Sequence, residues 1–115
     1  MNHQMKLNAW AFKQIANRTK KYEIRLYDEK RRDIEVGDKI VFSELPLLEN
    51  KIEVNVLDLI IANNFEELFT EFDPVLAGWK KGESPRKCAN DMSKYYPRED
   101  QEKYGVVAIK IKLDK

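Results

Sequence analysis

The side chains able to do chemistry concentrate in one short segment, Lys20–Asp38, which reads KKYEIRLYDEKRRDIEVGD. It holds as many basic as acidic residues, yet its first half alternates like a β-strand. Lys21, Glu23 and Arg25 would share one face of that strand, because successive side chains point to opposite faces. Such a face is either a ladder of solvated ion pairs or a site wall that offers cations to an anionic or nucleobase ligand.

A basic cluster follows in what reads as a charged loop, Asp28 to Arg32. Lys30, Arg31 and Arg32 have the charge needed to contact phosphates, but acidic neighbours on both sides dilute their field. We therefore expect this loop at the rim of a ligand cleft, with the strand face as its wall.

Two tryptophans have no place on an apolar stripe. Trp79 lies beside Lys80 in AGWKKG, within the irregular segment Asp73–Glu83. An aromatic ring next to a cation suits a nucleic-acid groove, so Trp79 is our stacking candidate. Trp10 lies opposite the apolar stripe of its own helix, and we expect it to cover a neighbouring loop.

Strong catalytic signatures are missing from the sequence. It contains no P-loop, no paired-histidine metal motif and no GxSxG elbow, so we expect neither a metal nor a cofactor. The one histidine, His3, lies near a terminus and is not expected to be catalytic. The one cysteine, Cys88, excludes an internal disulfide, suits a reducing compartment and should pack as a small hydrophobe beside Met92.

Composition limits the protein class. The 115 residues suit a single domain, 1–115, and 43% hydrophobic with 36% charged residues predicts a modest core under a charged surface. A formal net charge of +1 gives no global field, so nucleic-acid binding would need a local patch. No apolar run reaches the roughly 20 residues of a membrane span, and we expect a cytoplasmic protein without membrane contact.

Periodicity predicts a fold of class α+β. Asn8 can cap the first helix and Asn17 can take a left-handed position at its end. A phase switch after Val56 predicts a β-bulge. The expected elements are strand His3–Leu7, helix Ala9–Ala16, strand Lys21–Tyr27, strand Lys39–Phe42, strand Ile52–Ile61, a helix from Asn64 with Glu67 in a capping box, a helix from Ser84-Pro85 to Pro97, and a half-buried strand Val107–Leu113. Short connections favour a mixed or antiparallel sheet, as a small barrel with helices on its side.

Four stretches in this order carry a family resemblance: HQMKLNAWAFKQI, KKYEIRLYDEKRRDI, VGDKIVF and YYP…YGVVAIKI. Over essentially the whole chain they resemble the ASCH family, a branch of the PUA-like β-barrels. The resemblance implies a small mixed or antiparallel barrel flanked by about three short helices, with a cleft between sheet and helices. Members of the family are mostly thought to bind RNA.

Some compact relatives in that family are amidohydrolases that remove the acetyl group of N4-acetylcytidine with a lysine, a threonine and a glutamate. The resemblance places that lysine at Lys20. The threonine position, three residues later, is Glu23, which lacks a hydroxyl nucleophile, and Glu83 is the nearest candidate for the glutamate.

Three hypotheses follow. In the first, the chain binds RNA or a modified nucleoside: Lys20, Lys21 and Arg25 supply charge, Trp79 or a tyrosine stacks, and Glu23 accepts a hydrogen bond. The alternative is a cofactor-free amidohydrolase of N4-acetylcytidine or a related nucleoside, with Lys20 as activating base and Glu23 or Glu83 assisting proton transfer. The third is a protein-interaction domain that uses the AGWKKG loop.

Overall fold

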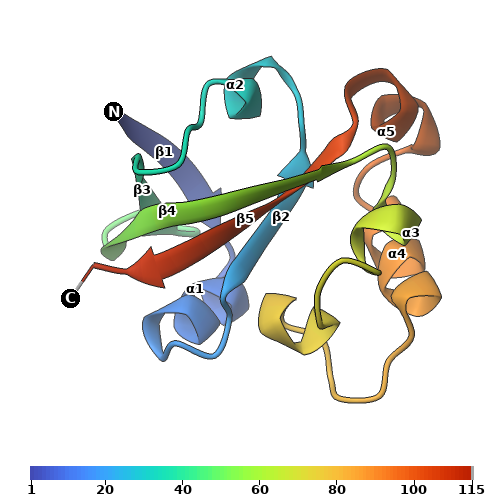
Figure 1. Ribbon diagram of the computed structural model, residues 1–115. Helices are drawn as coiled ribbons and strands as arrows, with labels where there is room; N and C mark the ends of the chain where they lie inside the picture. The colour runs from blue at the N-terminus through green and yellow to red at the C-terminus, as the bar shows by residue number, and fades with distance from the viewer. Residues whose placement is uncertain (115) are drawn as a thin grey trace.

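The computed structural model describes residues 1–114 and has one five-stranded sheet with helices around it (Figure 1). The strands are β1 (Asn2–Leu7), β2 (Tyr22–Leu26), β3 (Lys39–Glu44), β4 (Lys51–Ala62) and β5 (Val106–Leu113). The helices are α1 (Ala9–Ala16), α2 (Glu29–Arg32), α3 (Phe65–Leu68), α4 (Pro85–Ser93) and α5 (Arg98–Tyr104), with a 3₁₀ turn, η1 (Pro74–Ala77). None of these helices has the length and apolar character to cross a membrane. The class is α+β, as the sequence predicts.

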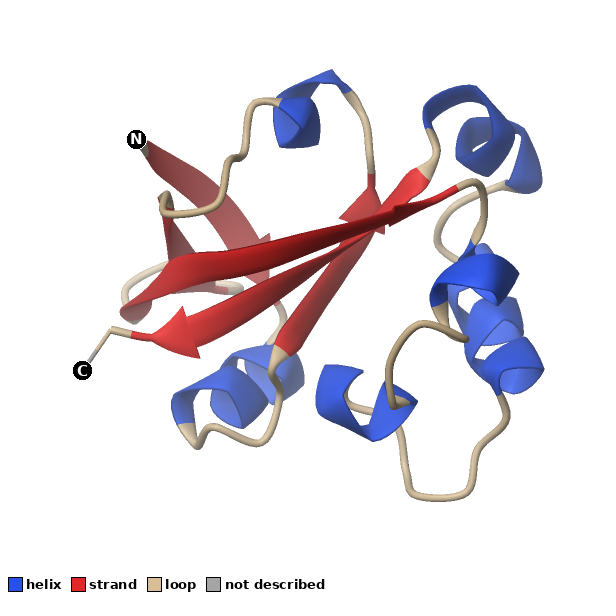
Figure 2. Cartoon of the chain, in the orientation of Figure 1, coloured by secondary structure: helices blue, strands red, loops and turns tan. Residues whose placement is uncertain are grey.

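The strand order is β1-β3-β4-β5-β2, so β1 and β2 are the two edges. β1 pairs with β3 in parallel, and the other pairs are antiparallel. The sheet curls into a half-barrel, with β1 and β3 turned away from β2 and β5 (Figure 2). A side chain links the two edges: Arg25 Nη2 on β2 donates to the Lys6 carbonyl oxygen on β1 at 3.0 Å.

The β5 strand is buried on both faces, because two separate core clusters meet on it. The first cluster includes Val107 and Ile109 and packs against Phe12 and Ile15 of α1. The second includes Val106 and Ala108 and packs against α3 and α4. The prediction of a half-buried strand is therefore wrong for the first half of β5, because helices cover both faces there.

Capping chemistry sets the helix ends. Asn8 Oδ1 accepts a hydrogen bond from the Ala11 amide at 2.8 Å, which confirms the predicted N-cap. The prediction for Asn17 is wrong: its φ is −89°, and Arg18 takes the left-handed conformation with φ 69°. Asn17 Oδ1 instead accepts hydrogen bonds from the amide and the hydroxyl of Thr19. These bonds form a local turn in which the left-handed conformation falls on Arg18, one residue after the predicted position.

The sequence predicted about three short helices, and residues 1–114 contain five. The expected loop Asp28–Arg32 is mostly the helix α2, because Asp28 Oδ1 caps the Arg31 amide at 3.1 Å. The segment Arg98–Tyr104 has too little apolar periodicity for the sequence to predict the helix α5. The buried side chain of Gln101 holds α5 against α3, because its Oε1 accepts a hydrogen bond from the Phe65 amide at 3.3 Å.

The bulge predicted in β4 and the N-cap predicted for α3 are confirmed. The register of β4 against β5 shifts between Val56 and Asp58, where the phase switch predicted a bulge. Asn64 Oδ1 accepts from the Glu67 amide at 2.9 Å at the start of α3. The capping box of α3 forms only in part, because Glu67 Oε2 accepts from the Asn64 side-chain amide at 3.3 Å instead of from its backbone amide. The segment expected to be irregular contains the 3₁₀ turn η1, and Gly78, the next residue, ends that turn with φ 108°.

Candidate functional site

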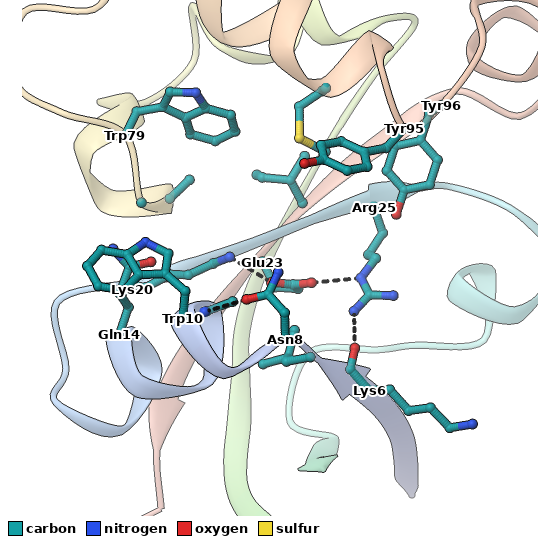
Figure 3. A pocket seen from close by; sticks show the side chains of 16 residues that line it. Lys6, Asn8, Trp10, Gln14, Lys20, Glu23, Arg25, Trp79, Tyr95 and Tyr96 are labelled. Carbon is teal, nitrogen blue, oxygen red and sulfur yellow. Dashed lines mark hydrogen bonds and ion pairs between the residues drawn. The ribbon is translucent and has the colours of Figure 1, made fainter. Parts of the chain in front are cut away.

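A cavity of about 380 Å³ opens between β2, α1, η1 and the end of α4. Figure 3 shows side chains from all four elements converging on it. Its lining residues are Lys6, Leu7, Asn8, Trp10, Ala11, Gln14, Lys20, Glu23, Ile24, Arg25, Ala77, Gly78, Trp79, Met92, Tyr95 and Tyr96. We call this cavity the base cavity.

The floor of the base cavity is a buried carboxylate between two cations. Glu23 is only 4% exposed. Its Oε2 accepts a hydrogen bond from Arg25 Nε at 2.7 Å, and its Oε1 lies 3.0 Å from Lys20 Nζ (Figure 3). Strand alternation brings Glu23 and Arg25 to one face of β2, as predicted. Lys20 reaches them from the turn between α1 and β2.

This triad keeps Glu23 ionised. Burial raises the pKa of the Glu23 carboxyl, but the charges of Lys20 and Arg25 outweigh it and bring that pKa below the ordinary 4.5. Burial lowers the pKa of Arg25, but the Glu23 charge outweighs this effect and raises that pKa overall. The contact of Glu23 Oε1 is with the Lys20 ammonium, 3.0 Å away. The floor thus holds a buried, ionised carboxylate between two cations.

Aromatic rings surround the mouth of the base cavity (Figure 3). Trp10 is 67% exposed and Tyr95 is 77% exposed. Trp79 lies deeper, edge-on to Phe69 with ring centroids 4.9 Å apart, and its Nε1 donates to Asp91 Oδ2 at 3.0 Å. The expectation that Trp10 covers a loop is wrong, since its ring stays exposed beside the cavity.

The structure brings four of the predicted site residues together, and they are Lys20, Glu23, Arg25 and Trp79. Lys21 lines a different cavity, beside Lys110 and Leu113. Its amide donates to the Leu76 carbonyl before β2 begins, which takes Lys21 out of the strand alternation.

Other predicted residues lie outside the base cavity. Glu83 pairs with Lys87 at 3.3 Å, and Lys80 is exposed on the loop before it. Arg32 donates to the Tyr104 carbonyl at 2.8 Å. Lys30 and Arg31 line a further cavity that also contains Arg25.

Sequence reasoning missed four polar or aromatic residues of the base cavity, and they are Lys6, Asn8, Gln14 and Trp10. The signal for Trp10 was present: a tryptophan on the polar side of an amphipathic helix has a reason to be exposed. Asn8 was recognised only as a helix cap, and nothing in the sequence distinguished Gln14.

The base cavity has no conventional nucleophile. No serine, threonine, cysteine or histidine is among its lining residues. The Thr19 hydroxyl donates to Asn17 Oδ1 at 2.7 Å, and His3 bonds Asp38 at 2.8 Å. Cys88 is fully buried, which confirms its packing role and raises the pKa of its thiol to about 11. Within residues 1–114, no three His, Cys, Asp or Glu side chains are grouped to hold a metal ion.

The curled mixed sheet, with its helices and a cavity beside β2, defines a fold of the PUA-like class. Residues 5–114 match the ASCH domain, and the chain belongs to that family. No curated protein matches the chain.

Solved structures agree with this assignment. The crystal structure of hypothetical protein PH0355 is 32% identical, has a TM-score of 0.84, and the match covers 99% of this chain and 100% of that one. The solution NMR structure of protein PF0455 from Pyrococcus furiosus is 34% identical, with a TM-score of 0.74 and coverage of 98% and 97%. The S128A mutant of ZmASCH from Zymomonas mobilis shares the fold at 11% identity, with a TM-score of 0.68 and coverage of 95% and 66%.

Proposed function

We propose that this chain binds a nucleobase, carried by RNA or by a modified nucleoside, in the base cavity. The observation that carries the proposal is Glu23: it is ionised, 4% exposed, and held between Lys20 and Arg25 at the floor of an aromatic-rimmed cavity. A carboxylate oxygen can accept more than one hydrogen bond, so a ligand N–H can add to the contact that Glu23 Oε1 makes with Lys20.

The groups around Glu23 complement the hydrogen-bonding edge of a base. Glu23 Oε1 can accept from a ring or exocyclic N–H, while the side-chain amides of Asn8 and Gln14 and the Lys20 ammonium can donate to a carbonyl oxygen beside it. Unpaired bases of single-stranded RNA present this edge when they are splayed out. The volume of about 380 Å³ lies in the usual range of small-ligand pockets.

The rings of Trp10 and Tyr95 supply the second half of recognition. Both are exposed at the mouth of the cavity, where a base can lie against them. Stacking on an aromatic side chain contributes about 1–3 kcal/mol per base and depends little on which base is bound. Selectivity then comes from Glu23, and affinity comes from the rings.

Binding is favoured over hydrolysis by the state of Glu23. An efficient general base has a pKa near the working pH, and the cations hold the pKa of Glu23 below 4.5. The cavity lining also lacks the serine, threonine or cysteine side chain that would attack an amide carbonyl.

The amidohydrolase alternative has one observation in its favour, the 3.0 Å approach of Lys20 Nζ to Glu23 Oε1. Lysine beside a carboxylate is a pair that can pass a proton to and from a bound amide. Incubation with N4-acetylcytidine, followed by chromatography, tests this reading. Cytidine formed by the parent and not by Lys20→Ala would establish it, and its absence from both would dismiss it.

The binding proposal is tested by calorimetric titration with single-stranded RNA hexamers of A, C, G or U. We expect at least one hexamer to bind, and Trp10→Ala to weaken it about 5- to 150-fold, the equivalent of about 1–3 kcal/mol. Because Trp10 is 67% exposed, the variant should fold normally. Trp10→Phe, which keeps a ring, is the matched control. Equal binding by Trp10→Ala, or no binding of any hexamer, would contradict the proposal.

A further inference from the structure

The cavity that Lys30 and Arg31 line has a volume of about 460 Å³. It lies next to the base cavity and shares Arg25 and Lys6 with it. β1, β2, β3, β4 and α2 contribute to its walls. Its lining residues are Gln4, Met5, Lys6, Arg25, Lys30, Arg31, Ser43, Leu48 and Lys51. Cations predominate in this lining and it includes no carboxylate, in a chain whose formal net charge is only +1. We call it the basic cavity.

Strand register creates the basic row on its floor. Lys6 of β1 pairs with Ser43 of β3, and Ser43 pairs with Lys51 of β4. Residues opposite one another across a sheet point to the same face, so two lysines flank one serine in a line across three strands. Lys51 Nζ donates to Ser43 Oγ at 2.9 Å. Lysines placed this way repel one another unless an anion lies between them.

The α2 helix brings further cations over this row. Lys30 and Lys6 have no ion-pair partner within residues 1–114. Arg31 Nη1 pairs with Asp28 at 3.4 Å, but Arg31 Nε is buried without a hydrogen-bond partner in the described chain. The basic cavity thus concentrates positive charge, and Arg31, one of its lining residues, has a buried N–H donor without a partner in the described chain. A phosphate group supplies the charge and the several acceptor oxygens that such a set can bind.

We propose that the basic cavity binds the phosphate of the nucleotide whose base occupies the base cavity. This inference rests on the proposed function and makes its ligand more specific: a nucleotide, free or within a strand, instead of an unphosphorylated nucleoside. Arg25 joins the two cavities. Its Nε holds Glu23 at the floor of the first, while its Nη2 bonds the Lys6 carbonyl beside the second.

Inorganic phosphate tests the basic cavity without any base. In a ¹⁵N NMR titration we expect saturable shifts of the backbone amides of Lys6, Lys30, Arg31, Ser43 and Lys51. The double variant Lys30→Ala/Lys51→Ala should bind phosphate at least tenfold more weakly. The control Lys13→Ala/Lys103→Ala removes the same charge from residues outside the three cavities and should bind like the parent. No saturable shift, or equal loss in both double variants, would overturn the inference.

A second titration separates this inference from the proposed function, using the four ribonucleosides and their 5′-monophosphates. We expect the monophosphate to bind at least tenfold more tightly than its nucleoside, and Lys30→Ala/Lys51→Ala to abolish that difference while binding the nucleoside unchanged. Nucleoside binding that needs Trp10 but gains nothing from the phosphate would overturn the inference alone. Phosphate binding without any nucleoside or nucleotide binding would overturn both.

Discussion

The base cavity and the basic cavity share Arg25 but treat charge in opposite ways. In the base cavity, Lys20 and Arg25 enclose one buried carboxylate, and aromatic rings form the mouth. In the basic cavity, cations from three strands and α2 gather with no carboxylate among the lining residues. The charges of the first arrangement are paired within the protein, whereas Lys6, Lys30 and Lys51 of the second have no ion-pair partner within residues 1–114.

Under the proposed function, this difference would let a nearly neutral chain bind selectively. A site whose charges are paired within the protein attracts anions only weakly, and it discriminates between ligands through hydrogen bonds and stacking. An uncompensated site attracts anions strongly but distinguishes them poorly. Placed side by side, the two would recognise a base through the first and a phosphate through the second. The predictions below separate these roles, beginning with the largest effect.

Removing Glu23 should damage the fold most. Glu23→Ala leaves the half-buried Lys20 and Arg25 without their partner, and loss of one member of a buried ion pair costs about 3–5 kcal/mol of unfolding free energy. Urea denaturation measures this loss. The control Glu53→Gln removes a carboxylate 3.8 Å from Lys39 at a more exposed site and should change stability far less. Similar losses for the two variants would mean that the buried triad does not stabilise the fold.

The two tryptophans of the base cavity should differ in stability. Trp79 packs edge-on to Phe69 and bonds Asp91, so Trp79→Ala should lose on the order of 3 kcal/mol of unfolding free energy. Trp10→Ala should stay within about 0.5 kcal/mol of the parent, because its ring is mostly exposed. Thermal and urea denaturation of both variants checks this. A large loss for Trp10→Ala would make that ring structural and weaken its assignment to stacking.

Salt dependence should distinguish the basic cavity from the base cavity. For a bound RNA hexamer, each neutralised phosphate contributes about 0.7 to the slope of log affinity against log salt. Lys30→Ala/Lys51→Ala should reduce that slope by about 0.7, while Trp10→Ala should weaken binding and leave the slope unchanged. If both variants changed the slope equally, the division of roles between the two cavities would be wrong.

The smallest effect is the pH dependence contributed by Glu23. Because the pKa of Glu23 is lowered in the folded chain, its ionisation stabilises the fold above pH 4.5, and this contribution is lost as pH falls through the lowered pKa. The stability difference between the parent and Glu23→Gln should therefore shrink from pH 7 toward pH 3. Other acidic groups titrate in both proteins and cancel. A difference that stayed constant or grew with acidity would contradict the ion-pair geometry.

Much of the base cavity could be predicted from the local pattern of KKYEIR. Strand alternation is enough to place Glu23 and Arg25 on one face, and capping chemistry places α1 beside them. Lys21 was misplaced because the strand begins one residue later, at Tyr22, a boundary set by long-range hydrogen bonds to Leu76 and Ile111.

The basic cavity could not be predicted because no local pattern encodes it. Lys6, Ser43 and Lys51 are far apart in sequence and meet only through the register of three strands. α2 was hidden for a different reason: one turn of charged residues has no apolar periodicity, and only the Asp28 cap identifies it. Tertiary register and capping, not composition, create this half of the candidate site.

The most direct test is a ¹⁵N NMR titration of the parent protein with the RNA hexamer that binds best. The account predicts shifts of the Trp10 and Trp79 indole signals and of amides at 20–25, 77–79 and 92–96, which surround the base cavity. Shifts confined to the separate cavity around Lys21, Leu57 and 110–113, or no saturable shift at all, would show that the base cavity does not receive the base.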